Sequence, residues 1–279
     1  MSVINTNIAS IKARSNLDRV QRDMDQSIAR LSSGKRITAA RDDAAGQAIA
    51  GRMESQIRGL TMGIRHAKDG QSLVGTSEGA MQELNKILQR MRELAVQSAS
   101  GVASSADRNY LDLEMTQLFN EINSISNNTK FNDQRILTGA TFTFYTDSDV
   151  AGTAITTVAA SASAQNLLVS VTSVDISSVT SNTSTTGVQA VITQIDSALS
   201  VVDNRRAALG AVSNRFDHII DNLQNVVMNT VQSQSRIVDA DFSVETTNLT
   251  RNTVLQQAAT SMLAQANAQK NSILALIQQ

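Results

Sequence analysis

The stretch MESQIRGLTMGIRHAKDGQSLVGTSEGAMQELNKILQRMRELA, residues 53 to 95, carries an apolar side chain every seven residues. This heptad line consists of Met53, Leu60, Ala67, Val74, Met81, Leu88 and Ala95. Because an α-helix turns every 3.6 residues, the spacing forms one nearly straight apolar stripe, which needs a helical partner. The stretch therefore predicts a helix of about fifty residues, roughly 75 Å long and too thin for an ordinary globular core.

A matching stripe lies more than a hundred residues further along the chain. Its heptad line is Val188, Ile195, Val202, Leu209, Phe216 and Leu223, with companion positions at Val191, Ala198, Val212, Ile219 and Val226. A third, shorter stripe follows a break at residues 100–105 and consists of Leu111, Met115, Leu118, Ile122 and Ile125. Three striped helices are enough to enclose a small bundle. We expect a mainly α fold, with long antiparallel helices in a rod-like coiled-coil bundle.

The helix with the shorter stripe has recognisable ends. Ser104 or Ser105 can serve as its N-cap, with Asp107 in the first turn, so the helix should begin near Ala106. Asn127 and Asn128 favour a left-handed stop at its other end.

Both chain ends carry amphipathic patterns with too few partners. Their apolar positions are Ile4, Ile8, Ile11, Leu17, Met24, Ile28 and Leu31 at the start, and Leu255, Met262, Ala266, Ile273 and Leu276 at the end. Helices with such narrow stripes are marginal in water unless they pack. We expect residues 1–33 and 245–279 to form a terminal coiled coil that orders on assembly.

The remaining sequence divides by composition. A central helical bundle is predicted from residues 47–140 and 187–233. Residues 34–46 and 234–244 are predicted linkers, and Asp42 and Asp43 are expected in the first turn of the next helix, where they favour its dipole. Residues 141–186 are rich in Ser and Thr, and TFTFYT and LLVSVTSVDI within them alternate like strands. We expect a short β-hairpin region or a minimal surface domain there.

Composition excludes several classes of function. The net charge is −1 without any run of Lys or Arg, so neither nucleic acid nor an anionic membrane is an expected partner. No stretch is apolar enough to span a membrane, and the first residues do not resemble a signal peptide. The chain has no Cys and therefore no disulfide. It also has no Pro, which suits long helices and removes slow prolyl isomerisation from folding.

Residues for catalysis or metal binding are scarce. The chain has two histidines, His66 and His218, each beside a stripe position and neither in an H-E-x-x-H context. The pairs Asp42-Asp43 and Asp239-Ala240-Asp241 lack the ligand spacing of a calcium loop and fit helix-end roles better. We expect no catalysis, cofactor or metal.

Three long motifs resemble bacterial flagellin. They are LSSGKRITAARDDAAGQAIAGRM (residues 31–53), QRMRELAVQSAS (89–100), and SRIVDADFSVETTNLTR with LQQAATSMLAQAN (within 235–267). The resemblance covers roughly the first 140 and last 90 residues, and it identifies a short form with a reduced middle region. It implies a secreted, extracellular subunit that polymerises into the flagellar filament. It also implies export through the flagellar type III channel and, as partners, an export chaperone and the filament cap and junction proteins.

The resemblance further implies a contact with the innate-immune flagellin receptor at Arg90, Leu94 and Glu114. The simpler interpretation of this surface is an amphipathic helix with one solvated face and subunit packing. The Ser/Thr-rich middle could carry O-linked sugars or be a plain solvated loop.

Two other functions remain open. A hook–filament junction protein would share the terminal coils, whereas a coiled-coil adhesin or translocator would show paired end helices without the three ordered motifs.

Overall fold

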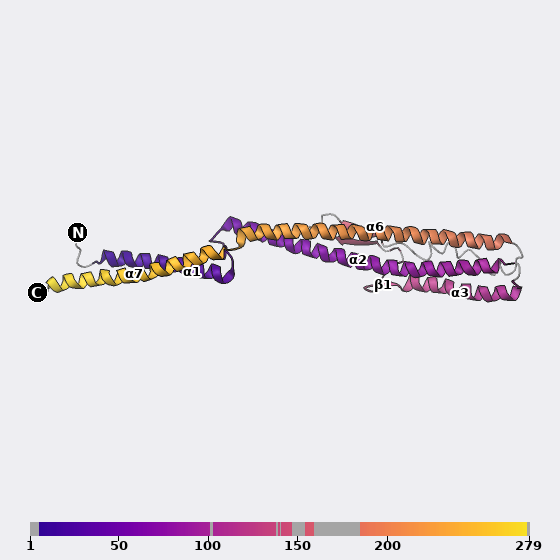
Figure 1. Ribbon diagram of the computed structural model, residues 1–279, viewed down its shortest axis with the longest axis horizontal. Coiled ribbons are helices and arrows are strands. Elements are labelled where there is room, and N and C mark those ends of the chain that lie inside the picture. Colours follow the sequence, from indigo (N-terminus) through magenta and orange to yellow (C-terminus); the bar gives the residue numbers. More distant parts are fainter. Residues whose placement is uncertain are drawn as a thin grey trace. The chain divides into compact units, whose positions relative to one another are not determined.

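The computed structural model describes residues 6–100, 103–137, 139, 141–146, 154–158 and 185–277 (Figure 1). The helices are α1 (Ile8–Ser33), α2 (Ala44–Ser98), α3 (Ser105–Asn128), α6 (Thr185–Val238) and α7 (Phe242–Ile277). The strands are β1 (Lys130–Phe131), β2 (Gln134–Arg135), β3 (Thr141–Tyr145) and β4 (Ala154–Val158). The prediction of long antiparallel helices with a small β-hairpin region is confirmed. The chain divides into a central unit, from Ile57 to Val227, and a terminal unit built from the residues on either side.

The core of the central unit lies between α2, α3 and α6, and its apolar seam follows the heptad lines. On these lines the buried side chains are Leu60, Ala67, Val74, Met81, Leu88, Ala95, Val188, Ile195, Val202, Leu209 and Phe216. Leu223, the last position of the α6 line, is half-buried. Met115 and Ile122 add the buried face of α3. Three helices therefore enclose one apolar core.

The first turn of α3 has the expected cap. Ser104 Oγ accepts a hydrogen bond from the Asp107 backbone N–H at 3.2 Å, and the Asp107 carboxylate accepts one from the Ser104 backbone N–H at 3.0 Å. This reciprocal pair satisfies two backbone donors that the first turn would otherwise leave open.

The end of α3 differs from the prediction of a left-handed stop at Asn127 and Asn128. The cap is Thr129, in an extended conformation with φ −68°, and its N–H bonds the Ile125 carbonyl at 3.0 Å. The left-handed residues come later, Asn132 at φ 49° and Asp133 at φ 62°. They form the two-residue turn between β1 and β2, where positive φ matches the twist of a tight hairpin.

Strands β3 and β4 pair antiparallel, with Phe142 opposite Thr157 and Phe144 opposite Ile155. Phe142 and Phe144 pack against the core, and the Phe144 ring meets the Phe216 ring edge-on, 5.9 Å between centroids. TFTFYT is therefore a strand, as predicted. The other predicted strand, LLVSVTSVDI, lies outside the described residues.

Two glycines on α2 make room for these neighbours. A Cβ at Gly63 would lie 2.6 Å from the Thr146 carbonyl oxygen, and a Cβ at Gly70 would lie 2.6 Å from Cζ of Phe216. Any side chain at either position would collide with what packs there. The hairpin end and the Phe216 ring thus depend on these two gaps in the helix surface.

Candidate assembly surface

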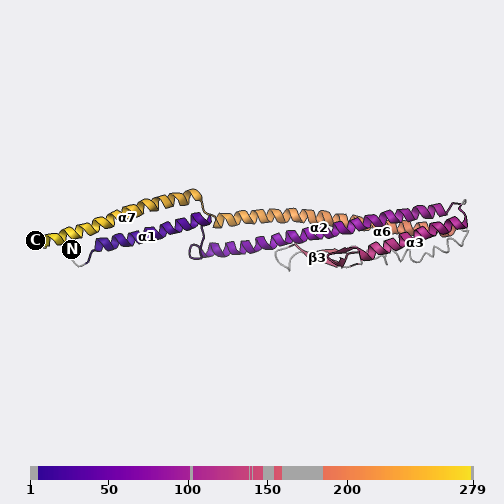
Figure 2. The same ribbon diagram turned by 90° about the horizontal axis from the view of Figure 1, so that it is seen from below.

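Helices α1 and α7 of the terminal unit lie side by side in both views (Figures 1 and 2). On α1 the half-buried apolar positions are Ala13, Leu17, Val20, Met24 and Leu31, with Ser27 buried. On α7 the half-buried positions facing them are Leu249, Thr253, Gln256, Ala259, Leu263 and Ala266. The seam between the two helices is therefore narrow and mixes apolar with polar side chains.

Polar contacts cross this seam at three levels. Arg30 Nη1 lies 3.0 Å from Glu245 Oε1, and the Glu245 side chain is only 7% exposed. Gln256 Nε2 donates to Gln21 Oε1 at 2.6 Å. Asn7 Nδ2 donates to the Ala266 carbonyl at 3.1 Å. Because such contacts work only when donor and acceptor are level, they hold α1 and α7 at one offset.

The predicted assembly residues divide between two faces. Leu17, Met24, Leu31 and Ala266 line the α1–α7 seam, each half-buried. The exposed members are Ile8 (63%), Ile11 (60%), Ile28 (46%), Leu255 (44%) and Met262 (64%). Ile4 lies outside the described residues, and the side chains of Ile273 and Leu276 are not described.

Sequence reasoning missed three further exposed apolar side chains, Phe242 (70%), Val244 (54%) and Val254 (60%) on α7. Val244 and Val254 stand directly beside polar neighbours that face α1, so only the helix phase reveals that they point outward. Single exposed apolar residues are common on protein surfaces, but a group of eight on one helix pair indicates an interaction surface. The eight side chains are spread around the outward sides of both helices, and we call these sides together the outer apolar face: Ile8, Ile11, Ile28, Phe242, Val244, Val254, Leu255 and Met262.

The two linkers within the terminal unit pair with each other. The Arg36 backbone N–H donates to the Val238 carbonyl at 2.6 Å, and the Ala240 N–H donates to the Gly34 carbonyl at 3.0 Å. The Arg36 guanidinium adds a 2.7 Å bond to the Ile237 carbonyl. Gly34 ends α1 with φ 67°, a left-handed conformation that glycine adopts at no steric cost.

Asp42 fastens the first linker to α1. Its carboxylate accepts hydrogen bonds from the Thr38 hydroxyl (2.9 Å), the Thr38 N–H (3.1 Å), the Ala39 N–H (3.0 Å) and Gln26 Nε2 of α1 (3.3 Å). These bonds, the Thr38 hydroxyl first, lower the pKa of the Asp42 carboxyl below its usual value.

The placement of Asp42 and Asp43 in the first helical turn is corrected. Helix α2 begins at Ala44, after both residues, and Asp43 caps it by accepting the Gly46 N–H at 2.8 Å. Asp42 instead closes the turn before the helix, because its side chain finds donors in Thr38 and Ala39.

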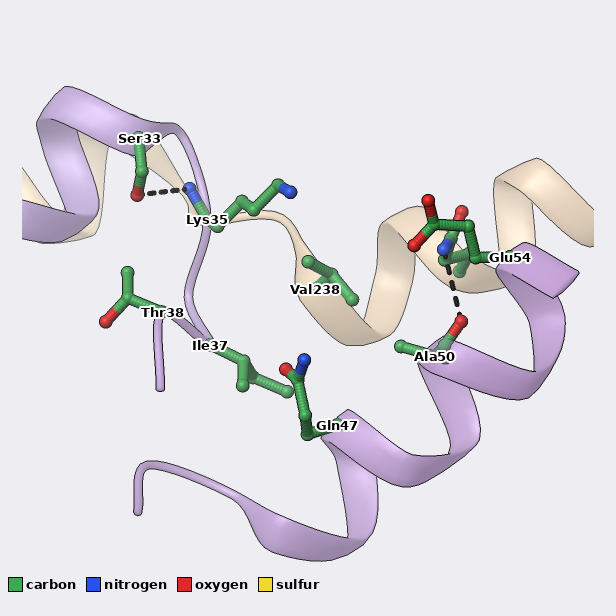
Figure 3. Close-up of a pocket in the computed structure, with 10 residues that line it drawn as sticks. Ser33, Lys35, Ile37, Thr38, Gln47, Ala50, Glu54 and Val238 are labelled. Atoms are coloured by element: carbon green, nitrogen blue, oxygen red, sulfur yellow. Dashed lines mark hydrogen bonds between the residues drawn. The ribbon is translucent and has the colours of Figure 1, made fainter. Parts of the chain in front are cut away.

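A small pocket lies between the first linker and the facing ends of α2 and α6 (Figure 3). Ile37 forms its apolar wall, Lys35 and Glu54 stand at its edge, and Gln234 Nε2 donates to the Ala50 carbonyl at 3.2 Å. No group of three or more metal-ligating side chains occurs among the described residues. No helix in that part of the chain is long and apolar enough to cross a membrane.

The three residues of the implied receptor contact do not share one surface. Arg90 bonds Glu114 of α3 at 2.9 Å and Glu93 at 3.0 Å, and the Glu114 bond is the main reason that the pKa of Arg90 is raised. Arg90 and Glu114 are roughly half exposed, whereas Leu94 is 1% exposed and belongs to the core. His66 and His218 are exposed on α2 and α6.

A chain of long paired helices, with an outer apolar face on its terminal pair, has the features of a structural protein that associates through its helices. Profiles described as "Bacterial flagellin N-terminal helical region" and "Bacterial flagellin C-terminal helical region" match residues 4–141 and 192–277. The chain belongs to the bacterial flagellin family, as its motifs predicted, and is a short form of it.

Relatives of similar length support this assignment. The chain is 39% identical to a flagellin of Halalkalibacterium halodurans over 281 residues, covering 99% of each chain. It is 36% identical to a flagellin of Bacillus subtilis over 304 residues, covering 98% of this chain and 99% of that one. The solved structure of a putative flagellar hook-associated protein from Vibrio parahaemolyticus has a TM-score of 0.63 at 13% identity, covering 71% of this chain and all of that one, and shows a shared fold alone. The protein is a structural subunit of the flagellar filament, which forms by self-polymerisation.

Proposed function

We propose that the outer apolar face of α1 and α7 is the surface through which the subunit polymerises. The seam between these helices mixes apolar with polar side chains, and eight large apolar side chains of the pair lie outside it. Ile8, Ile11 and Met262 are each at least 60% exposed, so their outward surface adds no hydrophobic stabilisation to the monomer. Covering these side chains with the same helices of neighbouring subunits removes that surface from water.

Covering the face contributes a favourable term to assembly. Burying a large apolar side chain contributes roughly 1.5 to 3 kcal/mol, and about half of that applies here because each of the eight is already partly covered. The face then contributes on the order of 10 kcal/mol, before the entropy of association and ordering is subtracted. Contacts between different surfaces of the subunit need not close into a ring, and they then continue as an open helical polymer.

Each part of the chain then has a role in the filament. A terminal pair with so small a seam orders fully on assembly, since isolated helices of this length are marginal. We assign the parts as follows: residues 1–33 and 245–279 form the terminal coiled coil, 34–46 and 234–244 the linkers, 47–140 and 187–233 the central bundle, and 141–186 a small surface region. The bundle seams at Leu60, Val74, Met81, Leu88 and on α6 hold the central bundle together, whereas the predicted seam residue Met53 is half-buried and precedes the central unit.

Family membership supports the remaining parts of the proposal. Flagellins form a structural family, so we propose no catalytic role and a location in the filament outside the cell. An export chaperone, the filament cap and the junction proteins are proposed partners on the same ground. A receptor contact is proposed for Arg90 and Glu114, with Leu94 acting only through the packing beneath them.

Seeded elongation tests the proposal. Purified full-length protein is added to filament fragments, and the products are examined by electron microscopy. A filament subunit extends the seeds into long fibres. Short assemblies that stop growing would support a junction protein instead, which the fold alone also accommodates. Seeds that remain bare at every subunit concentration would contradict both.

A further inference from the structure

A ladder of polar contacts runs beside the apolar seam of α2 and α6. In each rung a donor on α2 bonds an aspartate on α6: Gln71 to Asp217 at 2.8 Å, Asn85 to Asp203 at 2.9 Å, and Arg92 to Asp196 at 2.7 Å. Successive rungs are separated by seven or fourteen residues on both helices. The ladder therefore repeats with the period of the seam, at one fixed offset of the antiparallel helices.

One rung of this ladder is empty. By spacing it belongs to Glu78 and Gly210, which stand midway between the rungs at Gln71 and Asn85. A Cβ at Gly210 would have nothing within 4 Å, so a side chain would fit there. Glu78 instead lies 3.8 Å from Arg206, a long and half-exposed ion pair. Glu78, the one acidic residue among the α2 ladder positions, thus lies opposite Gly210, the one α6 ladder position without an aspartate.

The apolar seam does not by itself determine the axial offset of α6 along α2. Its heptad lines repeat every seven residues, so moving α6 by one heptad, roughly 10 Å along α2, again sets apolar side chains against apolar side chains. In one direction this movement places Glu78 opposite Asp203, and in the other it places Glu78 opposite Asp217. Like charges directly opposite each other repel, so both slipped registers are penalised by the same glutamate.

The steric fit of the Phe216 ring also disfavours both slipped registers, independently of the charge on Glu78. It fits against α2 because Gly70 has no side chain. A slip of one heptad would move the ring onto Ser77, which carries a side chain, or onto Gly63, whose surface is already covered by the Thr146 carbonyl. Charge and shape therefore agree on one register.

We propose that Glu78 is a register-determining residue of the α2–α6 pair, acting by repulsion in the two one-heptad slips and supported by the fit of Phe216 on Gly70. The outward surfaces of α2 and α6 then have one fixed offset. A slipped subunit would present those surfaces about 10 Å out of place to its neighbours.

The register can be measured in the full-length chain. The protein has no cysteine, so cysteines at Gln82 and Asn204, both exposed and within one turn of the Asn85–Asp203 rung, accept a pair of spin labels. The labelled chain is refolded from denaturant, frozen after increasing times, and the label-to-label distance is measured by pulsed electron resonance. Since the chain has no proline, a slow refolding phase cannot come from prolyl isomerisation.

Glu78→Lys is the test variant and Glu83→Lys its control. Glu83 is exposed on the same helix, and its carboxylate accepts a hydrogen bond from Lys86 Nζ of α2 at 2.8 Å. In Glu78→Lys each slipped register gains an attraction to Asp203 or Asp217 in place of a repulsion. We expect a second, longer distance, because a slip offsets the two labels by about 10 Å along the helix axis, with a population roughly three- to tenfold above that in Glu83→Lys, together with a slow refolding phase. A single distance and identical kinetics in both variants would overturn the proposal.

A double variant separates register choice from stability. Glu78→Lys with Gly210→Asp fills the empty rung with an attractive pair in the native register, so the thermal midpoint should return to at least that of the parent. The slipped registers keep their new attractions, so the second distance should persist at early refolding times. If the second distance disappears once stability is restored, Glu78 acts only through stability and the proposal is wrong.

Discussion

Replacing Ile11 by alanine should weaken polymerisation about tenfold without unfolding the subunit. Ile11 is 60% exposed on the outer apolar face of α1. The substitution removes three carbon atoms, worth roughly 0.8 kcal/mol each when fully buried. Scaled by the exposed fraction, the loss on assembly is about 1.4 kcal/mol per subunit, which corresponds to a tenfold change in an equilibrium constant.

The critical concentration for seeded elongation measures this loss directly. It is read as the subunit concentration left in the supernatant after filaments are sedimented at equilibrium. Ser15→Ala, at another exposed position on α1, is the matched control and should leave the critical concentration within a factor of two. Circular dichroism of both monomers should agree, since Ile11 makes little contact within the chain. A critical concentration for Ile11→Ala no higher than that of the control would refute the assignment of the outer apolar face.

Three further substitutions test individual features. Glu245→Ala leaves Arg30 without its partner in the α1–α7 seam and should destabilise the terminal pair by roughly 1 to 3 kcal/mol, seen as faster amide exchange in α1 and α7 with the central helices unchanged. Gly70→Ala forces the Phe216 ring away and should cost about 1 to 3 kcal/mol in thermal or denaturant unfolding, and an unchanged midpoint would contradict the close fit. The Asp42 carboxyl has a folded pKa below its unfolded value of 3.8, so its stabilising effect is present above that pH and is lost as the pH falls through the lower folded value. Asp42→Asn should therefore show less acid dependence of linker amide exchange than the parent.

Sequence reasoning was most successful where a pattern was long. The stripe from Leu60 to Ala95 and its partner on α6 extend over many heptads, so helix type, length and buried face all follow from spacing. The β1–β2 hairpin was missed because its strands are two residues long, too short for any alternation to show. Its turn at Asn132 and Asp133 carries the detectable signal, since both residues tolerate positive φ.

The terminal helices show what periodicity leaves out. Spacing shows that Ile8 and Ile11 belong to an apolar pattern, but it does not say which partner covers them. The α7 residues that meet α1 include Gln256 and Glu245, whose polar contacts fix the pairing face and turn the isoleucines outward. A stripe predicts that a partner is needed, while the identity of the partner depends on contacts between distant parts of the chain.

The pairing of α1 with α7 has a consequence for the newly made chain. Roughly 210 residues separate the end of α1 from the start of α7, and a ribosome adding about 5 to 20 residues per second needs on the order of 10 to 40 seconds to bridge them. During that interval the seam side of α1 stays exposed, because α7 has not yet been synthesised. The apolar side chains of α1 are therefore least protected while the chain is being made, and a shorter middle region shortens this interval.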